Sequence, residues 1–457
     1  MARRIILGHG INYGESRRWV KLANRLTSYT QPVYLDTDTN THVAFIGAAG
    51  VGKTLGGFTA LCQHMAQGYP AIIASPHPDL FEGVIDCAIG MGKRPEDVPI
   101  IDPTYRPQEL GSPIINPLWC GPGMLGYEAV DQTLSSLKSQ WRENWGPRTE
   151  DLMRNLLLVL QANHLPLNAA VTVLTSASER QKALAKVTDD NVRLFWRHMS
   201  ALKEYEFNLW IESPRNKLSA LTANPYLKGV FHVWEPTIDF FDIMTTGKVC
   251  PINLSRNHLK TDTRALFGSL LLGILDLAIV QLEEIPEKDR KPVMIMVDEC
   301  HEVWNSDACR SILTGSRKFG IGLFLLTQSL ANLPPADVDV LLGVIGNLGI
   351  FSCGRKDAER LVKEALHFTG EAIRDTATGR TFTPNEEVEA AIKQVMQAGR
   401  QEMLFKPRGK SPWFARTLRA EFPTIDPAKR EEFIRESARI YWRKPEAPPQ
   451  TTYKDRL

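Results

Sequence analysis

The chain has 457 residues, 43% of them hydrophobic, and its formal net charge at pH 7 is only +2. Single hydrophobic cores stop growing at about 250 to 300 residues, so we expect more than one packed part. The nearly neutral charge excludes a polycation that coats nucleic acid with its whole surface. A polyanionic partner would therefore have to meet a local patch or a pore.

The cysteines favour a reducing compartment and a cytoplasmic protein. They are odd in number, scattered and never spaced CxxC, which argues against a disulfide framework or a zinc site. We expect buried thiols at all seven positions, which are Cys62, Cys87, Cys120, Cys250, Cys300, Cys309 and Cys353.

No membrane segment is predicted. The opening MARRIILGHG leads into polar and charged residues, which is unlike a secretory signal. The one membrane-like stretch, residues 265–282, contains Asp276, and a charge deep in lipid costs about 2.5 to 3.5 kcal/mol even on the gentlest scales. We interpret this stretch as a buried helix.

Short apolar runs along the chain predict the fold class. Few of them alternate apolar with polar residues, and helical patterns lie between them, which is typical of a largely parallel sheet covered on both faces. The predicted class is therefore α/β. The runs lie at residues 33–35, 42–47, 71–76, 98–103, 248–255, 293–299, 322–329 and 348–354.

Two further segments differ from this pattern. Between Tyr127 and about Trp234 helical spacing continues while strand-like runs nearly vanish, which predicts a helical insert. Residues 400–419 read as a hairpin that turns at residues 407–410, and the proline-rich residues 444–457 read as a flexible tail.

The segment HVAFIGAAGVGKTLGG, residues 42–57, predicts a phosphate-binding loop between a strand and a helix. Its glycines let backbone amides approach phosphate oxygens, Lys53 would reach the β and γ phosphates, and the Thr54 hydroxyl would ligate magnesium. The predicted nucleotide-binding residues are Gly47, Ala48, Ala49, Gly50, Val51, Gly52, Lys53, Thr54 and Leu55.

An acidic pair follows the apolar run VMIMV. A nucleotide site needs, besides its phosphate loop, an apolar strand that ends in a carboxylate to hold the metal. Asp298 would hold the metal at the end of the strand, and Glu299 would orient or deprotonate the attacking water.

A hydrolase also needs groups that sense the γ phosphate and neutralise charge. Gln328, at the end of the run GLFLLTQS, is the predicted sensor because strand ends gather ligand contacts in open α/β sheets. Arg317 is a candidate arginine finger offered to a neighbouring subunit, and Arg355 is a second candidate. The sequence leaves the choice between them open.

These motifs, in this order, resemble the HerA/FtsK branch of P-loop motor ATPases. Within that branch the chain is similar to the TraG/TraD-type coupling proteins of type IV secretion and conjugation and to their HerA-like relatives. The resemblance rests on LDTDTNTHVAFIGAAGVGKT, INPL, the helical insert, NLS, VDE, SRKFGIGLFLLTQS and GRKDAERL, over about residues 30–420. It implies a RecA-like motor domain, a ring of six subunits, and ATP hydrolysis with Mg²⁺ that pumps DNA.

The resemblance also assigns roles and boundaries. It makes Lys53 and Thr54 the Walker A pair, Asp298 and Glu299 the Walker B pair, and Arg317 the arginine that reaches the adjacent subunit. Gln328 matches the sensor. The implied division is residues 1–30 as an N-terminal segment, 31–120 and 236–420 as the halves of the motor core, 121–235 as an all-alpha insert, and 421–457 as a helix and tail.

Coupling proteins commonly begin with transmembrane helices, which we do not find here. This difference argues against membrane anchoring and docking to a secretion channel, so a soluble translocase fits as well. The candidate partners besides DNA are a nuclease, a relaxase or a secretion channel, and the strandedness of the DNA is not predicted.

Two other functions compete with this one. The letters DECH at residues 298–301 resemble the DExH box of superfamily 2 helicases, but only 158 residues follow Glu299, too few for a second RecA-like domain with its additions. His301 is then a polar residue beside the strand. A nucleotide-gated scaffold that barely hydrolyses ATP would have no use for Glu299.

DNA contacts are predicted only as groups of residues. Contacts that carry no base preference go to the phosphate backbone through positive charge. The candidates are residues 17–25, residues 405–419 with Trp413 and Phe414 interleaved, and Lys138, Arg142, Arg193 and Arg197 in the helical insert.

Overall fold

A ten-stranded sheet runs through the computed structural model, which describes residues 4–12, 31–36, 42–105, 109–121, 123–366, 373–374, 381–418 and 422–444. In their order across the sheet, the strands are β2 (Gln31–Asp36), β1 (Arg4–Asn12), β13 (Trp413–Thr417), β12 (Glu402–Lys406), β9 (Asn347–Phe351), β3 (Val43–Ile46), β8 (Ile321–Thr327), β7 (Val293–Val297), β4 (Ala71–Ser75) and β6 (Val249–Asn253).

Six neighbouring strands, from β9 to β6, form a parallel unit. β8 lies between β3, which leads into the glycine-rich loop, and β7, which leads into the acidic pair. Because parallel strands end at the same edge, the loop, the acidic pair and Gln328 all lie at one edge of the sheet, which we call the active edge.

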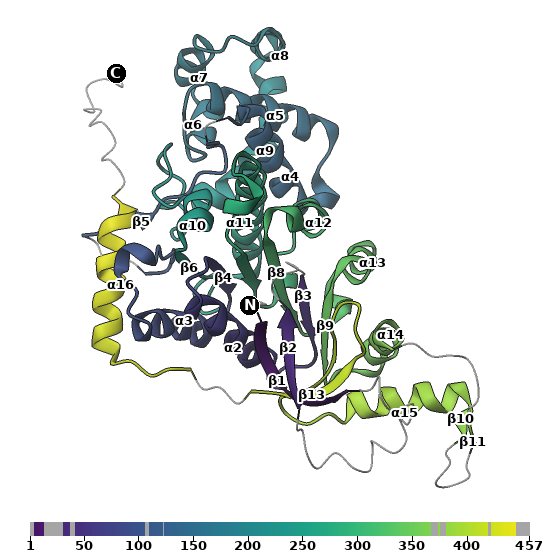
Figure 1. Cartoon of the computed structure of the whole chain (residues 1–457). Coiled ribbons are helices and arrows are strands. Elements are labelled where there is room, and N and C mark those ends of the chain that lie inside the picture. Colours follow the sequence, from purple (N-terminus) through teal and green to yellow (C-terminus); the bar gives the residue numbers. More distant parts are fainter. Residues whose placement is uncertain are drawn as a thin grey trace.

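Helices cover both faces of the sheet (Figure 1). Alternate side chains of the strands point to opposite faces, so that Phe45 and Met296 join one hydrophobic cluster while Ile46 and Ile295 join the other. The first cluster is completed by α2 (Lys53–Ala66) and α3 (Pro78–Gly90). The second includes α11 (Thr261–Gln281), α12 (Ser306–Gly315), α13 (Pro335–Val344) and α14 (Arg355–Ala365).

The other four strands extend the sheet in antiparallel fashion. β12 and β13 form the predicted hairpin, and β12 pairs with β9. β1 pairs with β13 and β2, although no strand was predicted before residue 31. Its side chains Ile5 and Leu7 are buried. Gly8 lets the two strands approach, because a Cβ there would lie 2.0 Å from the carbonyl oxygen of Arg416.

The apolar run at residues 98–103 was predicted as a strand, and this prediction is wrong. Within this run only Ile101 makes a bridge, to Ile252 in β6. The Asp102 carboxylate then accepts backbone hydrogen bonds from Thr104 and Tyr105, which turns the chain. The run is apolar because α16 (Pro427–Tyr441) covers it.

The segment predicted as a helical insert contains helices in the structure. α5 to α8 lie at the top of the view in Figure 1, away from β1 and β2. The helices are α4 (Gly126–Gln140), α5 (Pro147–Ala162), α6 (Ala169–Thr175), α7 (Ala177–Leu184), α8 (Asp190–Ala201) and α9 (Glu204–Thr222).

The apolar stretch at residues 265–282 lies in α11, as predicted. Within the part of the chain that the structure describes, residues Thr261–Glu284 are long and apolar enough to cross a membrane, and 72% of their most apolar window is buried. α11 packs against α4, α10 (Phe240–Thr246) and α12. These contacts account for its apolar composition.

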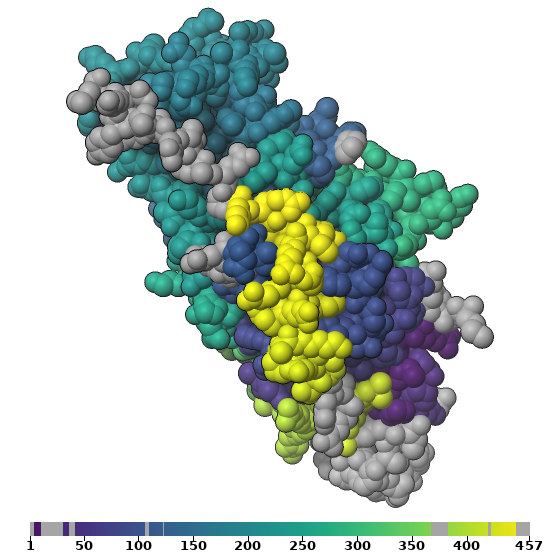
Figure 2. All heavy atoms as spheres, turned by 90° about the vertical axis from the view of Figure 1, so that its left-hand side faces the viewer, coloured from purple at the N-terminus to yellow at the C-terminus, as the bar shows by residue number. Residues whose placement is uncertain are grey.

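The predicted C-terminal helix is α16, which lies on the outer surface over segments from the first third of the chain (Figure 2). The Arg430 guanidinium donates two hydrogen bonds of 2.7 Å to the Asp86 carboxylate on α3. The short β14 (Trp442–Arg443) pairs with β5 (Ser112–Pro113).

Beyond the sheet, α15 (Pro384–Met396) precedes β12, and β10 (Ile373–Arg374) pairs with β11 (Thr381–Phe382). The predicted tail lies outside the described residues from 445 onward.

Candidate nucleotide site

The glycine-rich loop is held by the ends of the two strands that flank β3. The backbone N–H of Gly47 donates to the carbonyl of Thr327 at 3.3 Å, and that of Ala48 donates to the carbonyl of Ser352 at 2.8 Å. Gly50 and Gly52 have φ angles of 76° and 105°, a region that favours glycine. α2 begins directly afterwards at Lys53, so the loop ends at a helix N-terminus, where backbone amides and the helix dipole favour anions.

Lys53 folds back over this loop. Its ammonium donates to the carbonyl oxygens of Gly47 and Ala48 at 2.7 and 2.8 Å. Burial lowers the pKa of Lys53, while the charges of Glu299 and Asp298 act in the opposite direction. The structure thus places a buried cation between the loop and the acidic pair.

Asp298 contacts both the phosphate loop and β4, the strand that lies beside β7. Its Oδ1 accepts a hydrogen bond from the Thr54 hydroxyl at 3.4 Å, and its Oδ2 accepts one from the Ser75 hydroxyl at 3.0 Å. The side chain is buried, and burial raises its pKa. Hydroxyl and carboxylate oxygens are the ligands that Mg²⁺ prefers, so Thr54 and Asp298 fit a magnesium site.

Glu299 occupies a strained position next to Asp298. Its φ of 47° is in the left-handed region, which costs a residue with a side chain about 1 to 2 kcal/mol and is found preferentially at functional sites. Its Oε1 accepts a hydrogen bond of 2.7 Å from the Gln328 amide. Its Oε2 is buried and accepts no hydrogen bond from the residues that the structure describes, although His301 Nδ1 lies 3.5 Å away.

The charge state of Glu299 follows from its surroundings. Burial raises its pKa, but contacts with His77 and Gln328 and the charge of Lys53 outweigh burial, so the pKa is lowered overall. The carboxylate is therefore ionised at neutral pH, with one oxygen held by Gln328 and the other available.

Two residues of this site were not predicted. The Ser75 hydroxyl contacts Asp298, and the Nε2 atom of His77 lies 3.9 Å from Oε1 of Glu299. The pKa of His77 is raised by its contact with Glu299. Ser75 lies in the apolar run 71–76, which was predicted as a strand, and His77 directly follows it. The missing information was that β4 lies beside β7, because strand order is set by tertiary packing.

The two candidate arginines lie at opposite edges of the sheet. Arg317 is exposed in a 3-10 turn (Ser316–Phe319) that precedes β8. The seven residues of β8 separate it from the active edge by about 20 Å at roughly 3.3 Å per residue. Arg355 follows β9 at the active edge, where its guanidinium contacts Glu359 and Glu389, each at 2.7 Å.

Several candidate DNA-binding residues have partners within the chain. Lys138 forms an ion pair with Glu150 at 2.7 Å, and Arg142 donates to the hydroxyl of Ser306 at 2.6 Å. Phe414, predicted as part of a basic cluster that contacts DNA, is only 2% exposed, so its ring does not present a contact surface.

Of the other candidate DNA-binding residues, some are exposed and some lie outside the described residues. Arg193 and Arg197 are exposed on α8, and Trp413 is half-buried. Residues 17–25 lie outside the described residues, as does Arg419 at the end of the other cluster.

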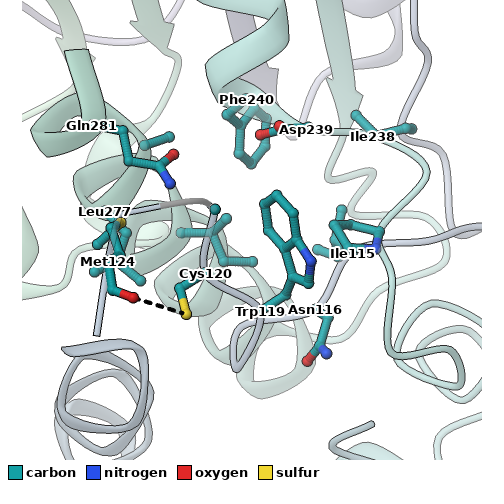
Figure 3. Close-up of a pocket in the computed structure, with 14 residues that line it drawn as sticks. Ile115, Asn116, Trp119, Cys120, Met124, Ile238, Asp239, Phe240, Leu277 and Gln281 are labelled. Atoms are coloured by element: carbon teal, nitrogen blue, oxygen red, sulfur yellow. Dashed lines mark hydrogen bonds between the residues drawn. The ribbon is translucent and has the colours of Figure 1, made fainter. Parts of the chain in front are cut away.

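A separate pocket lies away from the nucleotide site (Figure 3). It is lined by the segment around Trp119, by Phe240 of α10 and by Gln281 at the end of α11. In Figure 3 the rings of Trp119 and Phe240 lie near each other, with Asp239 beside them. It contains no residue of the predicted nucleotide site.

Comparisons with known proteins rest on structure. No protein-family model and no curated sequence matches the chain. A structure of the plasmid coupling protein TrwB in complex with ADP and Mg²⁺ superposes with a TM-score of 0.62 at 14% identity, covering 94% of this chain and 98% of the TrwB chain in that structure. VirB4 of Thermoanaerobacter pseudethanolicus gives a TM-score of 0.56 at 15% identity, covering 92% and 97%. The chain has the fold of TrwB and VirB4.

This likeness confirms the predicted α/β class with a RecA-like core. The predicted resemblance to conjugative coupling proteins is borne out at the level of the fold, because the plasmid coupling protein TrwB shares it. At 14 to 15% identity the agreement concerns the fold. The roles of individual residues have to be argued from the site itself.

Proposed function

We propose that the chain is a magnesium-dependent ATPase that moves DNA and works as a ring of identical subunits. The observation that carries this proposal is the convergence of Thr54, Asp298, Glu299 and Gln328 at one edge of the sheet, through contacts of 3.4 and 2.7 Å. They follow three adjacent strands, β3, β8 and β7. The TrwB structure with ADP and Mg²⁺ supports a nucleotide at this fold.

Each group has a chemical task in this proposal. Backbone amides of residues 47–55 bind the phosphates, and Lys53 exchanges its two carbonyl partners for phosphate oxygens. Thr54 and Asp298 hold Mg²⁺, which when bound neutralises charge on the phosphates.

Glu299 is the proposed general base. Its ionised carboxylate takes a proton from the attacking water, and the oxygen without a hydrogen-bond partner is the acceptor. Gln328 holds the other oxygen, so it fixes the orientation of the base and links it to the end of β8.

The proposed ring supplies an arginine from the neighbouring subunit. We propose Arg317 for this role, because it lies at the opposite edge of the sheet from its own loop and so would act at the loop of another copy of the chain. Arg355 lies at the active edge of its own subunit and is the alternative. An arginine finger contributes about 10³ to 10⁵ in rate where it has been measured.

The test is steady-state phosphate release with no DNA, with single-stranded DNA and with double-stranded DNA, for the unmodified chain and for Glu299→Gln. Glu283→Gln, the same chemical change at an exposed surface carboxylate, is the control. The proposal predicts turnover that DNA stimulates, its loss only in Glu299→Gln, and a DNA affinity whose logarithm falls linearly with log salt concentration.

The alternatives give different results. A nucleotide-gated scaffold binds ATP without turnover under any of these conditions. A superfamily 2 helicase would require a second RecA-like core, whereas the residues that the structure describes form a single large sheet of ten strands. If the protein is found to be a monomer that unwinds duplex DNA with ATP, this result would favour the helicase over the ring. A nuclease, relaxase or secretion channel would be a further partner of the motor and is not needed for turnover.

A further inference from the structure

Two cysteines from different helices, α2 and α3, contact each other. The Sγ atoms of Cys62 on α2 and Cys87 on α3 lie 2.9 Å apart. All seven thiols were predicted to be buried, and this prediction is wrong for two of them. Cys62 and Cys120 are half-buried, and the remaining five are buried. The sequence could not show this contact, since 25 positions separate the two residues.

The pair differs chemically from the other thiols. The hydrogen bond between the two sulfurs raises the pKa of Cys62 and lowers that of Cys87. Burial instead raises the pKa of Cys309 and of Cys353 to about 12. Thiolates are the reactive form, and the half-buried Cys62 gives a small oxidant access to the pair.

We propose that Cys62 and Cys87 form an oxidation site at which hydrogen peroxide converts the two thiols into an intramolecular disulfide. One of the two sulfurs attacks one peroxide oxygen, the O–O bond breaks, and one water leaves, which yields a sulfenic acid. The other sulfur then attacks the sulfenic sulfur, the S–O bond breaks, and a second water leaves with the remaining proton. Two electrons pass from the thiols to the peroxide.

The geometry requires little movement for this reaction. A disulfide has an S–S length of about 2.0 Å, so the two sulfurs approach by about 0.9 Å from their present 2.9 Å. The bond would join α2, which begins at Lys53 of the phosphate loop, to α3, which begins at Pro78 directly after His77. It would therefore fasten together two helices whose N-termini lie at the nucleotide site. Closing this loop also restricts the unfolded chain, which raises the thermal midpoint of the oxidised form.

The experiment treats the reduced, folded chain with hydrogen peroxide, blocks the remaining thiols by alkylation and identifies the peptides by mass spectrometry. The expected result is a peptide pair linked through Cys62 and Cys87, the loss of two titratable thiols, and a higher thermal midpoint that dithiothreitol reverses. Cys62→Ser abolishes all three changes, whereas Cys120→Ser, at the other half-buried thiol, leaves them intact.

Three results would overturn the proposal. They are separate alkylation of both cysteines after oxidation, sulfinic acid at either cysteine without a cross-link, and disulfides that join different chains. Because the linked peptide is sought in the unmodified chain, the outcome does not depend on whether the serine variants fold.

Discussion

Asp276→Asn is expected to stabilise the fold at alkaline pH and to do so less at acidic pH. Asp276 lies in α11 with its Oδ2 3.3 Å from the Gln132 amide, and burial raises its pKa from 3.8 to about 6. Each pH unit between these values corresponds to about 1.4 kcal/mol, so the ionised carboxylate costs the fold about 3 kcal/mol at pH 8. The cost is absent below pH 3.8, grows as pH rises toward 6, and is about half as large at pH 5.

The assay is thermal unfolding followed by circular dichroism at pH 8 and pH 5. Asp276→Asn should raise the midpoint at both values, with a gain at pH 8 about twice that at pH 5. Asp262→Asn, at an exposed position in the first turn of the same helix, is the control and should show no such difference in its effect. Equal gains at both pH values, or a loss at pH 8, would refute the reasoning that burial of the charge is costly.

Three further changes test other parts of the structure. Asp298→Asn should remove the Mg²⁺ dependence of nucleotide binding measured by calorimetry, because a neutral amide is a poor ligand; unchanged dependence would place the metal elsewhere. Mixing Arg317→Ala subunits with Glu299→Gln subunits should restore part of the ATPase activity at hybrid interfaces, and an absence of rescue would leave Arg317 without its proposed role. Gly8→Ala should lower the thermal midpoint, because its Cβ would collide with the carbonyl of Arg416; an unchanged midpoint would mean that β1 and β13 separate at little cost.

The parallel unit of the sheet could be predicted because its strands are buried on both faces. Continuous apolar runs mark such strands without reference to their neighbours, as at residues 293–299 and 322–329. The run at 98–103 is equally apolar yet is covered by α16 and turned by Asp102. Burial alone therefore does not distinguish a strand from a covered loop.

The antiparallel extension was only partly predictable. The hairpin of β12 and β13 was recognised through its turn, where Gly409 adopts a φ of 63°. No strand was predicted at β1, where Gly8 is needed for close approach to β13. That requirement depends on a strand some 400 residues later in the chain.

The candidate site was predicted where its residues belong to contiguous motifs. The phosphate loop and the acidic pair each carry their spacing in the local sequence, and the structure brings Thr54 and Asp298 into contact. Ser75 and His77 belong to no motif, and they join the site because β4 lies beside β7. The roles of all these residues remain predictions.

The central claim is that the phosphate loop and the acidic pair act on one nucleotide. The most direct measurement compares ATP binding and single-turnover phosphate release, with Mg²⁺ present, in the unmodified chain and in Glu299→Gln. We predict equal affinity for ATP and a release rate lower by about 10² to 10⁴ in the variant. Equal rates of release in the two proteins would contradict the account, since Glu299 would then take no part in splitting the terminal phosphate.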